Sequence, residues 1–91
     1  MDLKNKILSK KAVIGVVGLG YVGLPLAIEY ANKGFKTVGI DVDKRKIDSL
    51  KKKINYIQDI PEEEFSKALK SGTFSATESY AVVKDLDIVF I

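Results

Sequence analysis

Residues 12–27 of the chain read AVIGVVGLGYVGLPLA, in which an apolar run leads into three spaced glycines and a second apolar segment. Residues 12–17 contain three valines and one isoleucine, with no alternation of polar and apolar side chains. Such a run is typical of a strand covered on both faces, as in the middle of a parallel sheet. We therefore expect a central parallel strand directly before the glycines.

The residues after the glycines predict an amphipathic helix. Pro25 suits the first helical turn, where its missing N–H has no intrahelical partner, and Gly34 suits the position just past the end. A β-rich run over residues 35–40 follows, so the first half is expected to form two parallel strands joined by a helix. The apolar positions of that helix fall at i, i+3, i+4 and i+7: Leu24, Ala27, Ile28 and Ala31.

The second half of the chain predicts further helices and strands. Asp43 can cap a helix that buries Ile47, Leu50 and Ile54. Pro61 and the three glutamates after it predict a helix start, because proline fixes φ and acidic groups favour the positive end of the helix dipole. The other expected features are a buried stripe at Phe65, Ala68 and Leu69, a strand at 73–77, a turn or short helix at 80–84 and a buried strand at 88–91.

These elements predict an α/β fold, a Rossmann-type parallel sheet with flanking helices, over residues 12–91. Residues 1–11 are expected to form a polar N-terminal extension. The last apolar run reaches Ile91, whereas chain ends usually lie at the surface in polar segments. We therefore expect the Rossmann domain to be truncated here and the parent protein to continue beyond residue 91.

The composition excludes several kinds of protein chemistry. With no Cys and no His among 91 residues, the chain has no thiol nucleophile, no imidazole base and no usual zinc ligand set, so we expect no metal-binding residues in it. The net charge of +3 comes from dispersed lysines, and the run at 51–53 is interpreted as a solvated helix face, which argues against nucleic-acid binding. No apolar run approaches the roughly 20 residues of a membrane span, and residues 1–11 are too polar for a signal peptide, so a cytoplasmic protein with no membrane partner is expected.

Gly18, Gly20 and Gly23 form a G-x-G-x-x-G motif between the expected strand and helix. Gly18 permits a tight turn, Gly20 lacks the Cβ that would keep a pyrophosphate from the backbone, and Gly23 lets helix and strand pack closely. The backbone amides of Tyr21 and Val22 are expected to face the phosphates at the positive end of the helix. This context predicts dinucleotide binding, and the alternative is a tight turn that holds no ligand.

Asp41 is expected at the carboxyl end of the second strand. Its carboxylate can accept hydrogen bonds from the adenosine ribose hydroxyls and repel a 2′-phosphate, which favours NAD over NADP. Arg45 and Lys46 follow closely enough in sequence to keep NADP open. The alternative for Asp41 is a turn residue or helix cap, and Lys46 taken by itself is interpreted as a solvated helix residue.

Other polar side chains have weaker claims to function. Tyr30, Tyr56 and Tyr80 are expected to pack their rings with the hydroxyls reaching water. The acids at 62–64 suggest paired-carboxylate catalysis at first sight, but the helix dipole explains three acids at a helix start better.

The block over residues 16–27 goes beyond a general dinucleotide fingerprint and resembles the amino-terminal segment of the UDP-glucose/GDP-mannose dehydrogenase family. The similarity is strongest in GLGYVGLPLA, residues 18–27, and continues at 39–43, 75–77 and 85–89. Residues 56–61, YIQDIP, are most similar to members that oxidise UDP-N-acetylhexosamines, especially the UDP-N-acetylglucosamine 6-dehydrogenases. UDP-glucose enzymes more often carry an acid–proline pair at that place.

The resemblance implies a homo-oligomeric enzyme that oxidises the primary alcohol of a UDP-sugar to a carboxylate, with two NAD per turnover. In such enzymes a cysteine captures the intermediate aldehyde, and here that cysteine and the substrate domain would lie beyond Ile91. The resemblance also implies that Lys46 contacts the adenosine ribose. The cofactor-binding residues then implied are Gly18, Gly20, Tyr21, Val22, Gly23, Asp41 and Lys46.

Two other functions remain open from the sequence. A stand-alone nucleotide-sensing module would bind NAD or ADP tightly through these 91 residues alone, whereas a fragment is expected to bind weakly or misfold and to be catalytically inactive. A different NAD oxidoreductase, such as a hydroxyacid or hydroxyacyl dehydrogenase, would share the glycine motif but lack the LPLA continuation at 24–27.

Overall fold

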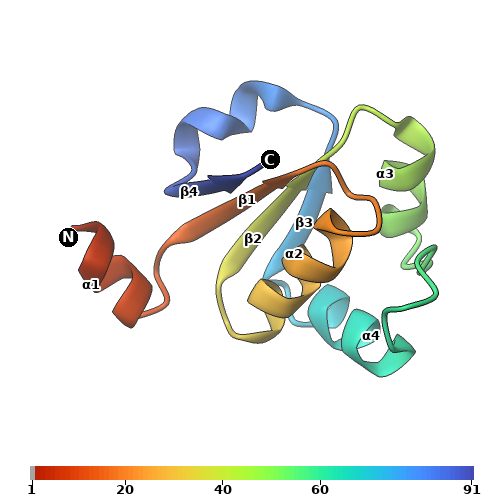
Figure 1. Cartoon of the computed structure of the whole chain (residues 1–91), viewed down its shortest axis with the longest axis horizontal. Coiled ribbons are helices and arrows are strands. Elements are labelled where there is room, and N and C mark those ends of the chain that lie inside the picture. Colours follow the sequence, from red (N-terminus) through yellow and green to blue (C-terminus); the bar gives the residue numbers. More distant parts are fainter. Residues whose placement is uncertain (1) are drawn as a thin grey trace.

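The computed structural model describes residues 2–91 and contains a four-stranded sheet with helices against it (Figure 1). The strand order is β3-β2-β1-β4, and every neighbouring pair is parallel. Gly15 in β1 lies opposite Val38 in β2 and Val89 in β4, so β1 is central, as its apolar run predicts. The strands are β1 (Val13–Val17), β2 (Lys36–Ile40), β3 (Phe74–Thr77) and β4 (Ile88–Phe90).

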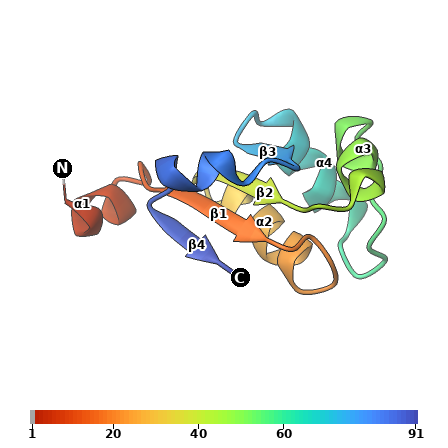
Figure 2. The same ribbon diagram turned by 90° about the horizontal axis from the view of Figure 1, so that it is seen from above.

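The helices join these strands and cover the sheet. α2 connects β1 to β2 and packs on both, and α4 lies beside α2 and reaches β3. Figure 2 shows α2 and the 3-10 helix η1 on opposite sides of β1. None of the helices within residues 2–91 is long and apolar enough to cross a lipid bilayer. The helices are α1 (Leu3–Leu8), α2 (Gly23–Asn32), α3 (Lys44–Lys51), α4 (Glu62–Lys70) and η1 (Tyr80–Asp85).

The hydrophobic core forms where α2, α3 and α4 meet the sheet. All four apolar positions predicted for α2 are buried, and Phe65 and Ala68 of α4 are fully buried, as their spacing predicts. Leu69, the third residue of the stripe predicted for α4, is only partly buried. Gly34 has φ +96°, a left-handed conformation that glycine adopts without strain, and α2 ends just before it. Periodicity therefore placed the apolar faces of these helices correctly.

Two predictions about burial are wrong. Ile54 is 52% exposed, because α3 ends at Lys51 and the chain turns through Lys53 at φ 61° before the next apolar position is reached. The strand at the end of the chain forms, but β4 pairs on one side only and its Val89 is 37% exposed. Within residues 2–91 this strand is one edge of the sheet, and β3 is the other.

The segment before β1 is a helix tied to the sheet. Asp2 caps α1 by accepting a hydrogen bond from the amide of Asn5. Lys6 Nζ lies 2.8 Å from Asp87 Oδ1, and Asp87 Oδ2 accepts from the Val13 amide at 2.8 Å. Asp87 thus connects α1, the start of β1 and the start of β4.

We expect Asp87→Asn to lower the free energy of unfolding at pH 7. The Lys6 ammonium and the Val13 amide hold the pKa of the Asp87 carboxyl below its ordinary value of 3.8. A lowered pKa means that the carboxylate stabilises the fold above pH 3.8 and loses this contribution as pH falls through the folded-state value. Urea unfolding of both chains should show a difference at pH 7 that shrinks in acid, and a difference that is the same at every pH would contradict this role.

Candidate functional site

The glycine motif forms an exposed loop between β1 and α2, at the carboxyl edge of the sheet. Gly18 has φ +92° and its amide donates to the Ile40 carbonyl at 2.8 Å, which joins the loop to the end of β2. A Cβ on Gly23 would collide with the carbonyl oxygen of Gly18, so the third glycine is required by close packing. A Cβ on Gly20 would meet only Lys46 Nζ, at 4.0 Å. The roles predicted for Gly18 and Gly23 therefore have a direct geometric basis.

The first turn of α2 presents backbone amides to open space. Within residues 2–91, the N–H groups of Gly20, Tyr21, Val22 and Gly23 donate no hydrogen bond, and no side chain caps the helix. The side chains of Tyr21 and Val22 are 79% and 81% exposed. These unpaired amides lie at the positive end of a ten-residue helix, beside Gly20, which has no side chain to fill the space in front of them. This arrangement fits an anionic group such as a diphosphate.

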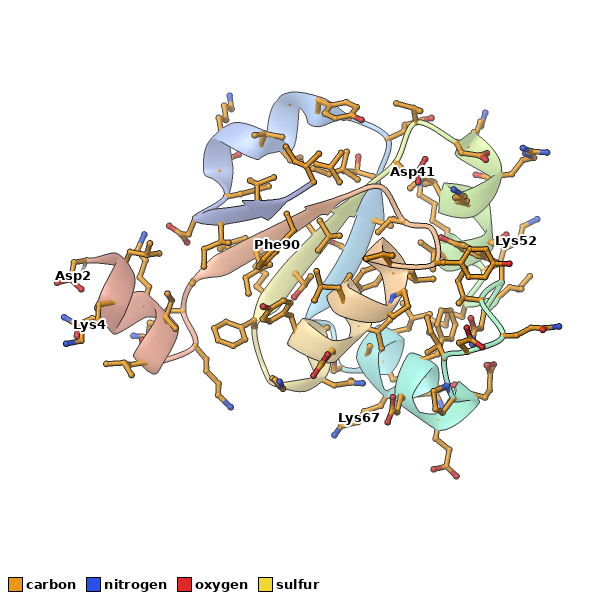
Figure 3. The ribbon with its side chains drawn as sticks, viewed as in Figure 1. Asp2, Lys4, Asp41, Lys52, Lys67 and Phe90 are labelled. Carbon is orange, nitrogen blue, oxygen red and sulfur yellow. The ribbon has the colours of Figure 1, made fainter. Side chains whose placement is uncertain are left out.

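Asp41 follows β2 directly and faces this loop (Figure 3). Its Oδ2 accepts from the Leu19 amide and its Oδ1 from the Asp43 amide, both at 2.8 Å, and the residue is only 8% exposed. Burial raises the pKa of Asp41, but the two amide hydrogen bonds and the charge of Lys46 outweigh it, so the net pKa is below the ordinary value. Asp41 is therefore an ionised anchor of the glycine loop, and each oxygen keeps one acceptor position unused by these amides.

Two cations of α3 lie near the two acids that follow β2. Lys46 Nζ is 3.6 Å from Asp41 Oδ2, and its side chain is 35% exposed. Arg45 extends into solvent and pairs with Asp43, whose carboxylate also caps α3 by accepting from the Arg45 amide at 3.0 Å. The structure thus brings Lys46 together with Asp41 and the glycine loop, and it directs Arg45 toward Asp43 instead.

Tyr56 was missed by the sequence reasoning. Its hydroxyl donates a 2.6 Å hydrogen bond to the carbonyl of Leu19, the residue between the first two glycines, so the prediction that this hydroxyl reaches water is wrong. Burial and the charges of Asp41 and Asp43 raise the pKa of the Tyr56 hydroxyl, which keeps it protonated as a donor. No local pattern indicates this contact, because the partners are 37 residues apart.

Two cavities flank the glycine loop. One, of about 160 Å³, lies where β1 and β4 end, at the point where the strand order reverses, and ligands of open parallel sheets bind at such points. The other, of about 270 Å³, lies beyond the end of β2 on the side of α3. The first is lined by Val16, Val17, Gly18, Val22, Gly23, Leu26, Phe90 and Ile91, and the second by Asp43, Arg45, Lys46, Ser49 and Tyr56.

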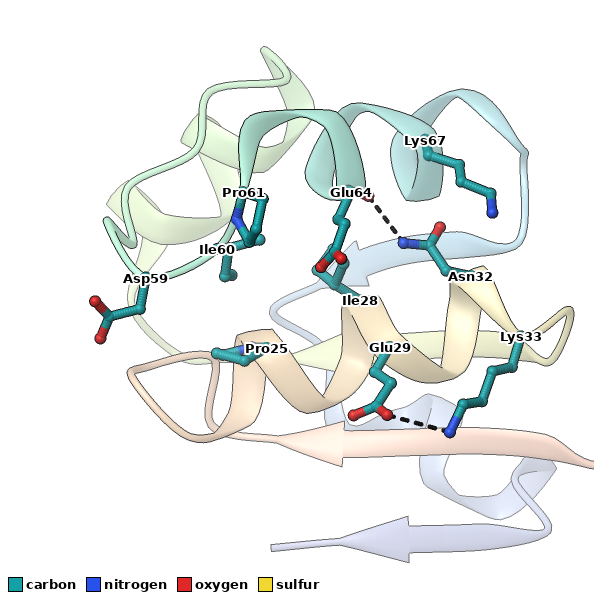
Figure 4. Close-up of a pocket in the computed structure, with 10 residues that line it drawn as sticks. All are labelled: Pro25, Ile28, Glu29, Asn32, Lys33, Asp59, Ile60, Pro61, Glu64 and Lys67. Carbon is teal, nitrogen blue, oxygen red and sulfur yellow. Dashed lines mark hydrogen bonds and ion pairs between the residues drawn. The ribbon is translucent and has the colours of Figure 1, made fainter.

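A larger cavity, of about 390 Å³, lies between α2 and α4 and contains none of the predicted site residues (Figure 4). Two interactions join some of its polar groups, whereas Asn32 Oδ1 is buried without a hydrogen-bond partner within residues 2–91. Glu29 pairs with Lys33 at 3.1 Å, and Asn32 Nδ2 donates to the Glu64 carbonyl at 2.9 Å. We place the functional site at the glycine loop, because a row of successive backbone donors there faces open space at a helix start.

Comparisons with known proteins agree with this placement. Residues 12–91 match the UDP-glucose/GDP-mannose dehydrogenase family, NAD binding domain. The UDP-N-acetyl-D-glucosamine 6-dehydrogenase of Salmonella typhi is 46% identical over 55 residues, which cover 60% of this chain and 13% of that protein. The UDP-N-acetyl-D-mannosamine dehydrogenase of Pyrococcus horikoshii is 36% identical over 83 residues, covering 86% of this chain and 19% of that protein.

A solved structure gives the same result for the fold. The UDP-glucose dehydrogenase of Pyrobaculum islandicum superposes with a TM-score of 0.81 and 36% identity, over 88% of this chain and 19% of that one. The matched part of the chain thus spans less than a fifth of the length of each of these three proteins. The family match extends over the whole of residues 12–91, which favours this family over the hydroxyacid and hydroxyacyl dehydrogenases that share the glycine motif. The chain belongs to the UDP-glucose/GDP-mannose dehydrogenase family, as part of its NAD-binding domain.

Proposed function

We propose that this chain is the amino-terminal NAD-binding segment of a larger UDP-sugar 6-dehydrogenase. The observation that carries the proposal is the row of unpaired amides at the start of α2, beside the open space at Gly20 and next to an ionised acid at the end of β2. The length of the relatives supports a larger enzyme, since the three compared proteins are more than five times longer than the matched part.

Each site residue has a proposed part in holding NAD. The amides of Gly20, Tyr21 and Val22 bind the diphosphate, because they have no acceptor within residues 2–91. Asp41 accepts hydrogen bonds from the adenosine ribose through its remaining acceptor positions. Lys46 approaches the same ribose from α3, 3.6 Å from Asp41.

We further propose that the parent enzyme converts a UDP-N-acetylhexosamine to the uronate, with UDP-N-acetylglucosamine favoured. NAD supplies a hydride acceptor, and each of the two oxidation steps passes one hydride to one NAD. The resemblance implies that a cysteine captures the aldehyde, and this chain contains no Cys. We therefore propose that the catalytic groups lie in the rest of the enzyme and that the 91 residues alone are inactive. Relatives named for UDP-N-acetylglucosamine and for UDP-N-acetylmannosamine support this substrate class.

The test is NADH formation by the full-length protein with four substrates: UDP-N-acetylglucosamine, UDP-N-acetylmannosamine, UDP-glucose and GDP-mannose. We expect UDP-N-acetylglucosamine to give the highest kcat/KM and two NADH per sugar. A higher kcat/KM with UDP-glucose would overturn the proposed substrate class. Absence of NADH formation with all four substrates would overturn the proposal that the parent protein is a UDP-sugar dehydrogenase.

A second experiment distinguishes part of a larger enzyme from a stand-alone nucleotide-sensing module. Calorimetric titration with NAD should give weaker binding for the 91-residue chain than for the full-length protein, because half of a doubly wound sheet leaves the nicotinamide end uncovered. Equal dissociation constants would favour a stand-alone nucleotide-sensing module.

A further inference from the structure

The peptide of Leu19 is held from both sides by residues outside the glycine loop. Its N–H donates to Asp41 Oδ2 at 2.8 Å, and its carbonyl accepts from the Tyr56 hydroxyl at 2.6 Å. The Leu19 side chain is fully buried, and a Cβ on Gly39 would lie 2.8 Å from its methyl groups. Leu19 is therefore fixed at three points, although it stands between two glycines.

This fixation matters because glycines on either side would otherwise leave the loop with high conformational freedom. A flexible loop pays an ordering cost when it closes on a ligand, and preorganisation removes that cost from the binding free energy. The carbonyls of Gly20 and Val22 accept hydrogen bonds from amides of α2, at 3.1 and 3.3 Å, and these bonds hold the peptides of the helix start. The Gly20 amide belongs to the same planar peptide as the Leu19 carbonyl, so the direction of this unpaired donor is set at Leu19.

Tyr56 is placed to do this from a distance in sequence. It lies in the segment between α3 and α4 and also lines the 270 Å³ cavity beside Asp43 and Lys46. Its short hydrogen bond is partly buried, so water competes poorly for the Leu19 carbonyl. The ring and the hydroxyl therefore connect the α3 side of the site to the glycine loop.

We infer that Tyr56 is a positioning residue for the dinucleotide, which holds the glycine loop in its binding conformation through the Leu19 carbonyl. This inference rests on the proposed NAD site. It assigns the hydroxyl an effect on the diphosphate, which it does not touch, and little effect on the adenosine half. We place that half in the 270 Å³ cavity, because Lys46, the proposed ribose contact, lines it.

The test uses Tyr56→Phe in the full-length protein, with NAD, ADP and adenosine as calorimetric probes. The variant keeps the ring and removes only the hydroxyl, so the Leu19 carbonyl loses its donor. We expect the dissociation constants of NAD and ADP to rise about tenfold, as expected for the loss of one hydrogen bond, while that of adenosine changes little. Tyr80→Phe is the matched control, because Tyr80 is 50% exposed on η1 and its loss of a hydroxyl should change none of the three constants.

The ratio of ADP to adenosine affinity is the decisive quantity. Partial unfolding would weaken both ligands equally and leave that ratio unchanged, so a changed ratio reports the loop itself. An unchanged ratio in Tyr56→Phe overturns the positioning role while the wild-type protein still binds NAD. Failure of the wild-type protein to bind NAD would instead overturn the proposed function.

Discussion

Gly20→Val is expected to abolish useful NAD binding while leaving the protein folded. The added side chain points into the open space next to the unpaired amides of the α2 start, where the only neighbour of its Cβ is Lys46 Nζ at 4.0 Å. A diphosphate held by those amides would clash with the new methyl groups. We expect the NAD dissociation constant to rise on the order of 100-fold, which corresponds to about 2.8 kcal/mol of binding free energy.

The measurement is calorimetric titration with NAD, accompanied by circular dichroism and thermal unfolding. Gly20 does not have a positive φ, so valine is tolerated by the backbone and the Tm should stay close to the wild-type value. Gly23→Ala provides the contrast, because its Cβ would collide with the Gly18 carbonyl and should lower the Tm. Wild-type affinity for NAD in Gly20→Val would mean that this loop does not hold the diphosphate.

The fold was predictable because its signals are local. The apolar run of β1, the spacing of the buried residues in α2, and Gly34 after its end each specify a structure through neighbouring residues alone. The parallel pairing of β1 with β2 follows from the helix that joins them. The place of β4 beside β1 does not follow from the connections, because β3 and β4 are consecutive in the chain and lie at opposite edges of the sheet. Ile54 shows the limit of this reasoning, because helical spacing continues in the sequence beyond the residue at which α3 ends.

The site was predictable only in part. The glycine spacing and the acid after β2 identify the residues that come together, since both lie at the carboxyl edge of adjacent strands. The contacts of Tyr56 with Leu19 and of Asp87 with Lys6 join segments that are 37 and 81 residues apart. Pairings of this kind depend on how the elements pack in three dimensions, and no periodicity in the chain encodes them.

Asp41 shows how one residue can match both a functional and a structural prediction. Its position at the end of β2 suits ribose binding, and its carboxylate also accepts the amides of Leu19 and Asp43, as a turn residue would. These amides and the charge of Lys46 keep the pKa low in spite of burial, so the carboxylate stabilises the fold above pH 3.8 and loses this contribution as pH falls through its folded-state value. Stability and cofactor preference must therefore be measured together.

Asp41→Ala is expected to lower both the free energy of unfolding and the preference for NAD over NADP. Leu19 is fully buried, and its amide would be left without an acceptor, at a cost of about 1–3 kcal/mol of unfolding free energy for each unsatisfied donor. Loss of the carboxylate should also weaken the binding of NAD, because the ribose hydroxyls lose an acceptor. The ratio of the NADP to the NAD dissociation constant should fall about tenfold, because a 2′-phosphate is no longer repelled. Urea unfolding and titration with both cofactors measure the two effects in the same protein.

Asp48→Ala is the matched control, since it removes an exposed carboxylate from α3 and leaves the amides of Leu19 and Asp43 paired. Asp48→Ala should change the stability and the preference for NAD only slightly. A change seen only in Asp41→Ala would therefore show that the position of the Asp41 carboxylate beside the loop matters, and not the loss of one negative charge alone. A loss of stability in Asp41→Ala with an unchanged preference for NAD would make Asp41 an anchor of the glycine loop only. Discrimination against NADP would then have to come from Asp43, the other carboxylate beside the end of β2, whose partner Arg45 would become free to meet a 2′-phosphate if that acid were removed.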